Sequence, residues 1–224
     1  MSNAVLVIGK TGSGKSTSME NLDPDSTFII NVVGKDLPFR GGKKKYTSEK
    51  KNCHTTNNHA EIVSLLKQIS TSVPKVKTII IDDFQYVLSY EFMARAKETR
   101  YGKFTDIAQH AMSVINTAKS LRDDVTVIFL SHSEEETNSL GVVSHKIKTV
   151  GKMLDSQITI EGLFTIVLMA KIAKSAEGTI SYVFETKGDV NTTVKSPKDM
   201  FKEANIPNDL KLVIDAIEEY NNAD

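Results

Sequence analysis

The chain has 224 residues, and its 28 basic and 28 acidic side chains balance to a formal net charge of zero at pH 7. A chain of this length is typical of one domain with a full core, so residues 1–224 are predicted to form a single domain. The balanced charge excludes a chain that is basic throughout, so any nucleic-acid surface must be a local patch. The single cysteine, Cys53, excludes an intrachain disulfide framework and favours a reducing compartment.

The N-terminus leads directly into a predicted strand, without the basic and apolar leader of an exported protein. No apolar run approaches the roughly 18 residues that a membrane-spanning helix needs. We therefore expect a cytoplasmic protein that has no membrane partner.

The apolar run Ala4–Ile8 leads into GKTGSGKS, residues 9–16, which fits the phosphate-loop pattern G-x-x-x-x-G-K-[ST]. Glycines let this loop turn tightly, so that its N–H groups point at phosphate oxygens, and a helix from about Gly14 to Leu22 would add its positive end. Lys15 would reach the β- and γ-phosphates of ATP, and the Ser16 hydroxyl would bind Mg²⁺. The predicted nucleotide-binding residues are Gly9, Lys10, Thr11, Gly12, Ser13, Gly14, Lys15, Ser16 and Thr17.

Two further apolar runs end in polar residues, as buried parallel strands do where they meet a ligand. The run at 77–83 ends in Asp82 and Asp83 and has the Walker B pattern. Asp82 would hold Mg²⁺ directly or through a water, and Asp83 would orient or deprotonate the attacking water. The run at 125–132 ends in Ser131 and His132, and His132 would stand where the γ-phosphate is sensed.

Two polar segments carry clusters of lysines. Residues 34–58 form a predicted basic loop, which is either a solvated loop or a positive lobe that tracks single-stranded DNA. Residues 133–152 form a predicted mobile loop, in which Lys152 would reach a neighbouring subunit's nucleotide as an arginine finger does. The candidate DNA-binding residues are Lys43, Lys44, Lys45 and, as a stacking residue, Tyr46. The spacing of Cys53, His54 and His59 matches no zinc site, so no metal site is predicted there.

The remaining periodicities predict a strand at 27–33, helices at 59–70, 85–98, 104–121 and 209–220, and a hairpin of strands at 163–170 and 180–184. Apolar strands that alternate with helical stretches indicate an α/β fold with a mainly parallel sheet. A C-terminal β-hairpin and a terminal helix would complete it.

The order of these parts resembles the RecA-like branch of P-loop ATPases, and more narrowly the short phage-encoded members associated with single-strand annealing and recombination. The resemblance implies ATP and Mg²⁺ at the edge of a parallel sheet, homo-oligomers with nucleotide between subunits, and single-stranded DNA as partner. A single-strand-binding protein is a further expected partner, and the compartment would be the host cytoplasm. The residues that carry the resemblance lie at 9–17, 28–31, 37–39, 81–86, 129–135, 151–155 and 195–197.

One position departs from that family. RecA-like enzymes usually place a water-activating glutamate at the tip of the strand beside the phosphate loop, whereas this chain has Asn31 there, with Asp36 some way beyond. Either Asp83 takes that role or hydrolysis is weak, so a slow, DNA-stimulated ATPase is expected.

Two alternatives stay open at this point. A nucleotide or nucleoside kinase has the right size, but kinases need several guanidinium clamps, and only Arg40, Arg95, Arg100 and Arg122 are present. A non-hydrolysing, ATP-gated DNA-binding or loader module would bind DNA with negligible phosphate release.

Overall fold

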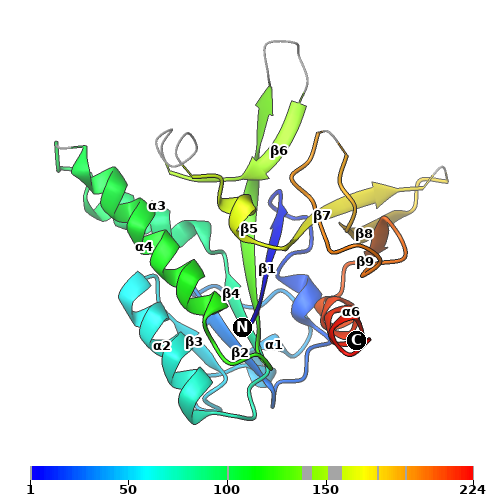
Figure 1. Cartoon of the computed structure of the whole chain (residues 1–224), viewed down its shortest axis with the longest axis horizontal. Helices are drawn as coiled ribbons and strands as arrows, with labels where there is room; N and C mark the ends of the chain where they lie inside the picture. The colour runs from blue at the N-terminus through cyan, green and yellow to red at the C-terminus, as the bar shows by residue number, and fades with distance from the viewer. Residues whose placement is uncertain are drawn as a thin grey trace.

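The computed structural model describes residues 2–99, 101–137, 143–150, 158–175, 177–189 and 191–223 (Figure 1). The first half of the chain, in order, consists of β1 (Asn3–Gly9), the 3₁₀ turn η1 (Thr17–Met19), β2 (Thr27–Asn31), α1 (Gly42–Lys45), β3 (Cys53–Thr55), α2 (His59–Ser72), β4 (Thr78–Asp82) and α3 (Gln85–Ala94). The second half consists of α4 (Gly102–Lys119), β5 (Thr126–Thr137), β6 (Val143–Ile147), η2 (Ile160–Leu163), β7 (Ile166–Lys174), β8 (Ile180–Glu185), β9 (Asn205–Pro207) and α6 (Leu210–Asn221).

The strands form one sheet with the order β3-β2-β4-β5-β1-β7-β8-β9, and β6 pairs with β5 beside this path. The pairs from β3 through β7 are parallel, whereas β8 and β9 run antiparallel to their neighbours. This arrangement confirms the predicted α/β class, with a mainly parallel sheet, a C-terminal β7–β8 hairpin and a terminal helix. β1, which carries the phosphate loop, lies between β5 and β7 in the middle of the sheet.

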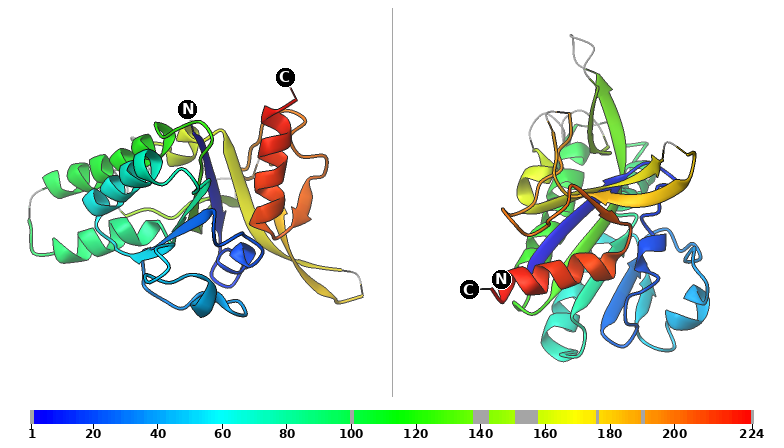
Figure 2. Two further views of the ribbon diagram at one scale, coloured as in Figure 1. Left: turned by 90° about the horizontal axis from the view of Figure 1, so that it is seen from below. Right: turned by 90° about the vertical axis from the view of Figure 1, so that its right-hand side faces the viewer.

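Helices cover both faces of the sheet, as the views from below and from the side show (Figure 2). Because side chains alternate along a strand, β1 contributes Leu6 and Ile8 to one core and Val5 and Val7 to the other. The first core contains residues of α2, α3 and α4, and the second contains residues of η1 and α6. All four β1 side chains are fully buried, so β1 is fixed from both sides and the loop after it begins from a rigid support.

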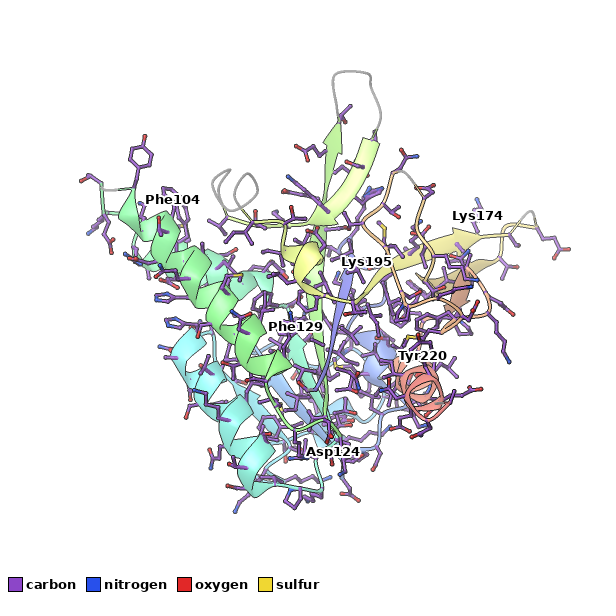
Figure 3. The ribbon with its side chains drawn as sticks, viewed as in Figure 1. Phe104, Asp124, Phe129, Lys174, Lys195 and Tyr220 are labelled. Carbon is purple, nitrogen blue, oxygen red and sulfur yellow. The ribbon has the colours of Figure 1, made fainter. Side chains whose placement is uncertain are left out.

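Aromatic packing supports the first core at the level of the Walker B strand. Phe129 of β5 is fully buried, lies between the sheet and α4, and packs edge-on against Phe84 at 5.0 Å and Phe164 at 5.3 Å between ring centroids (Figure 3). Phe84 directly follows the paired carboxylates of β4, and its N–H donates to the Leu130 carbonyl at 2.9 Å. The turn that holds Asp82 and Asp83 is therefore fixed to β5.

The helix predicted over 14–22 is wrong in extent. The chain makes a single i→i−4 bond, from Ser18 N–H to the Gly14 carbonyl, and then the 3₁₀ turn η1. Few residues separate Gly14 from the turn formers that begin at Asn21, and a helix so short does not recover its nucleation cost. Buried Met19 and Leu22 hold this turn against the sheet instead. A phosphate at this loop would meet the loop N–H groups and Lys15 rather than the dipole of a long helix.

The segment 34–58 is only partly a loop. It contains the four-residue helix α1 and the short strand β3, which pairs with β2 from Ile29 to Asn31. Neither element has an apolar period of its own, which is why the sequence predicts a loop. β3 depends on the free edge of β2, and α1 packs through Gly42, where an added Cβ would lie 2.9 Å from Leu37.

The segment 133–152 also differs from the predicted mobile loop, because much of it is a β-hairpin. β5 continues past the sheet, and its residues 133–137 pair antiparallel with β6 (Figure 1). Lys146 of β6 lies 3.6 Å from Glu134 and 3.2 Å from Glu136, so the acidic and basic runs face each other across the hairpin. Residues 138–142 and 151–157 lie outside the described part of the chain, and with them Lys152.

The other predicted helices and strands are present in the structure, although their first and last residues differ from the predicted ones. α2 begins after Asn58, whose side chain accepts hydrogen bonds from the N–H groups of Ala60 and Glu61. α6 begins in the same way after Asp209, whose side chain accepts from the Lys211 N–H. α3 ends at Ala94, before the predicted end at 98. α4 begins at Gly102 and ends at Lys119, whereas the prediction was 104–121.

Candidate nucleotide-binding site

The phosphate loop leaves the middle of the sheet through glycines that no other residue could replace without displacement. A Cβ on Gly9 would lie 2.6 Å from Ser13 Oγ and 2.7 Å from the Ala170 carbonyl oxygen. Gly14 has a φ of +90°, and a Cβ there would lie 3.0 Å from the Tyr182 ring. The loop is therefore pressed against β7 and β8, and its turn requires glycine at both positions.

Lys15 is folded back onto this loop. Its ammonium group donates to the carbonyl oxygens of Gly9 at 2.8 Å and Lys10 at 2.9 Å, and only 6% of the residue is exposed. Burial lowers the pKa of Lys15 to about 8, although the nearby carboxylates of Asp83 and Asp82 offset part of that effect. An anion that replaced the carbonyl partners would stabilise the charged form of this lysine.

Ser16 and Asp82 meet beneath the loop. The Ser16 hydroxyl donates to Asp82 Oδ1 at 2.9 Å, and Asp82 is fully buried. Its second oxygen, Oδ2, has no hydrogen-bond partner among the described residues. Burial and the neighbouring Asp83 carboxylate raise the pKa of Asp82 to about 6. A buried carboxylate oxygen without a partner, beside a serine hydroxyl, fits the oxygen ligands that Mg²⁺ takes.

Asp83 follows Asp82 in a left-handed backbone conformation, with a φ of +64°. For a non-glycine residue this conformation is strained, and such strain tends to occur at functional sites. The Asp83 carboxylate is 3% exposed, accepts a hydrogen bond from Lys35 Nζ, and has His132 Nε2 at 3.5 Å. Burial acts to raise the pKa of Asp83, but His132 and Lys35 outweigh it and hold the pKa below its usual value. The carboxylate is thus ionised at neutral pH.

His132 connects Asp83 to the phosphate loop. The β1–β5 register pairs His132 with Gly9, which brings its Nδ1 within 3.2 Å of the Thr11 hydroxyl. An Nε2–H that points at the Asp83 carboxylate leaves Nδ1 to accept from Thr11. Gln85 fixes the backbone here, since its Oε1 accepts from the His132 N–H at 3.0 Å and the Ser131 hydroxyl at 3.1 Å. A change at the loop can therefore reach Asp83 through a single side chain.

A cavity of about 890 Å³, large enough for a nucleotide, is lined by Thr11, Lys15, Ser16, Asp83 and His132 among others. Several parts of its wall were not predicted from the sequence, among them Lys35, the Tyr182 ring, and Pro207 and Asn208 before α6. Lys35 follows a strand that was predicted, so its position in the basic run was the only signal. Tyr182 and Asn208 had no signal, because the antiparallel strands β8 and β9 bring them to the loop from the far end of the chain.

The candidate DNA-binding lysines, Lys43, Lys44 and Lys45, do not line this cavity. Lys43 is exposed and pairs with Asp36 at 2.7 Å, Lys44 is exposed, and Lys45 donates to the Glu20 carbonyl at 3.0 Å. Tyr46 contradicts its predicted stacking role, because it is 4% exposed and its hydroxyl donates to the Leu22 carbonyl. Its ring belongs to the second core, where it anchors α1.

The resemblance to RecA-like enzymes implied that Asn31 lies on the strand beside the phosphate loop. The structure shows that it does not. β4 and β5 separate its strand, β2, from β1. The Asn31 side chain closes a turn instead, accepting from the Gly34 N–H at 2.8 Å and donating to the Lys35 carbonyl at 2.7 Å. Asn31 thus positions the residue whose ammonium group reaches Asp83.

The parallel sheet, the glycine loop after β1 and the Ser16–Asp82 pair define a P-loop nucleotide-binding protein. A family model described as an AAA domain matches residues 1–198, and the chain belongs to this family of P-loop ATPases. AAA domains generally bind ATP with Mg²⁺ and hydrolyse it. No curated protein matches the sequence of the chain. Among the described residues, no helix has both the length and the apolar character needed to cross a lipid bilayer.

Proposed function

We propose that the protein is a slow, Mg²⁺-dependent ATPase that acts on single-stranded DNA in recombination or replication of the phage type. The observation that carries the enzymatic part is the convergence of Lys15, Ser16 and the ionised Asp83 on one cavity, with Asp82 buried directly behind Ser16. A binding module needs the first two groups only. The ionised carboxylate of Asp83, which Lys35 and His132 hold at the cavity, favours hydrolysis over binding alone.

In this proposal Lys15 exchanges its two loop carbonyls for phosphate oxygens of ATP. Ser16 and Asp82 would hold Mg²⁺, which neutralises charge on the β- and γ-phosphates when it is bound. The Asp83 carboxylate accepts a hydrogen bond from the attacking water and orients it. The positive charge of Lys35 on one Asp83 oxygen makes the carboxylate a weaker base, which would keep the basal rate slow.

His132 would sense the nucleotide state, because it is in contact with both Thr11 of the loop and Asp83. Occupation of the loop by phosphate moves Thr11, and His132 transmits this movement to the carboxylate. DNA could stimulate hydrolysis by the same route if it displaced Lys35 from Asp83. The base of the nucleotide would lie at the other end of the cavity, against the Tyr182 ring and Asn208.

The DNA contact is proposed for the exposed lysines around α1. Lys43, Lys44, Lys50 and Lys51 are all exposed, so their side chains are accessible to a phosphate backbone. Lys35 and Asp36 line the cavity and lead into this segment, which joins the two sites along the chain. Tyr46 has no part in this contact because it is buried.

We also propose homo-oligomers with the nucleotide between subunits. The hairpin β7–β8 carries the exposed apolar residues Ile172, Ile180 and Tyr182, and Tyr182 also lines the cavity. A second copy packed against this hairpin would bury them and close the cavity. Lys152 is the candidate that would reach across such an interface. A single-strand-binding protein is proposed as a further partner on the DNA.

The test is phosphate release by the purified chain with and without single-stranded DNA, together with its mass in solution with and without ATP. We expect slow Mg²⁺-dependent release that DNA accelerates, and a larger mass in ATP. ATP binding without any release, with or without DNA, would support the non-hydrolysing alternative. Phosphate transfer to a nucleoside or nucleotide rather than to water would support the kinase alternative.

A further inference from the structure

Three metal-ligating side chains from three helices meet on the helical layer that covers one face of the sheet. His59 is the first residue of α2, Glu91 lies in α3 and His110 in α4. One potential ligand atom from each residue lies within 4.8 Å of the other two. We propose that these three residues form a binding site for a transition-metal ion of the Zn²⁺ class. This site is independent of the nucleotide-binding site and of the function proposed for it.

The sequence predicted no metal site around Cys53, His54 and His59. In the structure His54 and His59 have different partners. His54 pairs with Glu61 at 2.8 Å, whereas His59 stacks on His110 with 3.6 Å between ring centroids. Only the packing of α2 against α4 brings the two histidines together, because about 50 residues of sequence separate them. Sequence spacing could not have indicated this site.

The distances around Glu91 suit a four-coordinate ion. Its Oε2 lies 2.9 Å from His110 Nδ1 and 3.9 Å from His59 Nδ1. Ligand atoms around a tetrahedral zinc with bonds of about 2.1 Å are separated by about 3.4 Å, which falls between these two distances. The three side chains are between 18% and 32% exposed, so an ion can enter from solvent without the helices moving apart.

One ring must rotate for the ion to bind. The two imidazoles are nearly parallel, with 11° between their planes, so their lone pairs run side by side rather than toward one point. His59 is the ring that can turn, because it is the first residue of α2 and the cap that begins this helix binds the Ala60 and Glu61 N–H groups, not His59. Rotation of the His59 ring would direct its Nδ1 and the Nδ1 of His110 toward one point beside Glu91 Oε2.

Arg95 orients the carboxylate for this purpose. Its guanidinium lies 3.2 Å from Glu91 Oε1, the oxygen that is also 2.9 Å from His110 Nδ1, and contacts Glu98 at 2.8 Å and Asp106 at 2.6 Å. Because Arg95 keeps two other carboxylates, Glu91 can share its charge with a metal without leaving a guanidinium unpaired. Hydrogen bonds of this kind fix the orientation of metal ligands and raise metal affinity.

The donor set decides the class of metal. Two imidazoles and one carboxylate are typical ligands for Zn²⁺, with a fourth position open to water, whereas Mg²⁺ and Ca²⁺ prefer oxygen ligands only. The proposed ion would therefore not compete with Mg²⁺ at Ser16 and Asp82. Its direct effect would be to clamp α2, α3 and α4 together.

The experiment is a Zn²⁺ titration of the full chain by calorimetry, in excess Mg²⁺ and in a Cys53→Ser background that removes the only thiol. We expect one Zn²⁺ per chain and a rise in melting temperature. His59→Ala, Glu91→Gln and His110→Ala should each lower the Zn²⁺ affinity at least about tenfold. The matched control, His54→Ala, removes a histidine that pairs with a glutamate elsewhere and should leave the affinity unchanged.

No Zn²⁺ binding by the Cys53→Ser chain, or equal affinity in the control and the three variants, would overturn the proposal. If a variant fails to fold, the Cys53→Ser chain itself supplies the answer through Co²⁺. Tetrahedral Co²⁺ should give intense visible absorption and hyperfine-shifted signals from two imidazole rings. Octahedral, weakly absorbing Co²⁺ without shifted imidazole signals would again reject the site.

Discussion

The chain places positive charge in two regions that differ in their surroundings. At the nucleotide cavity, Lys15 is buried and Lys35 reaches a buried carboxylate, so each is fixed by specific partners. Around α1, the ammonium group of Lys43 is largely exposed and its one carboxylate partner, Asp36, is exposed as well. Buried charges interact strongly in a low dielectric, whereas exposed charges are screened by water and salt. Single substitutions should therefore have large effects in the first region and only collective effects in the second.

The largest expected effect is on Lys15, the most buried lysine at the cavity. Lys15→Ala removes two charge-assisted hydrogen bonds to phosphate, worth about 3 kcal/mol together, so ATP affinity should fall about a hundredfold or more. Calorimetry with a slowly hydrolysed ATP analogue would measure this loss. Lys67→Ala is the control, because Lys67 is an exposed lysine of α2 that does not line the cavity. Unchanged affinity of Lys15→Ala would reject the site itself.

Asp83→Asn should separate hydrolysis from binding. The amide keeps the shape of the carboxylate but not its charge, so turnover should fall about 10²- to 10⁴-fold while ATP affinity changes little. Phosphate release and nucleotide binding would be measured on the same preparation. Asp36→Asn, which alters an exposed carboxylate at the cavity rim, should leave turnover unchanged. Rapid hydrolysis that survives Asp83→Asn would assign water activation to another group.

The pH dependence of ATP binding tests whether the cavity really perturbs its lysine. Burial lowers the pKa of Lys15 to about 8 in the free protein, and bound phosphate favours the charged form. Binding therefore takes up a proton above that pKa, and ATP affinity should fall by up to about tenfold per pH unit above about pH 8. Titrations between about pH 7 and about pH 9.5 would measure the slope. Affinity that stays constant over this range would contradict the lowered pKa, and Lys15→Ala should show no such slope.

The exposed region should respond as a group. Reversal of charge at the exposed Lys43, Lys44 and Lys51 should weaken single-stranded DNA binding and flatten its dependence on salt, by about 0.7 in log–log slope for each phosphate that is no longer neutralised. Fluorescence anisotropy at several salt concentrations would measure both. Lys67→Glu, on the surface of α2, should change neither. If the triple variant behaved like this control, the segment would be a solvated surface.

The smallest effect is expected at Tyr46. Tyr46→Phe removes a buried hydrogen bond to the Leu22 carbonyl and should lower the free energy of unfolding by about 1 kcal/mol. DNA affinity should not change, since the ring is inside the second core. Denaturant unfolding and anisotropy would separate the two. If a stably folded Tyr46→Phe variant bound DNA more weakly, Tyr46 would contact DNA after all, although it is buried.

Strands and helices could be predicted where the apolar residues within the segment itself show which faces are buried. β1, β4 and β5 appear as apolar runs because parallel strands are covered on both faces, and α2 appears as a 3.6-residue period because one of its faces meets the sheet. β3, β6 and β9 could not be predicted, since each exists only through hydrogen bonds to a strand distant in sequence or to a polar hairpin partner. The expected helix after the phosphate loop was wrong because local glycine and turn chemistry ended it.

The same division holds at the candidate sites. The sequence alone determined the phosphate loop and the two carboxylates where β4 ends, because phosphate and metal chemistry require these residue types at fixed local spacings. Only the tertiary structure decided that Lys35 holds Asp83, that Tyr182 closes the cavity, and that His59 meets Glu91 and His110. Those contacts join segments whose separation in the chain carries no signal, since sheet order and helix packing, not local spacing, determine which side chains meet.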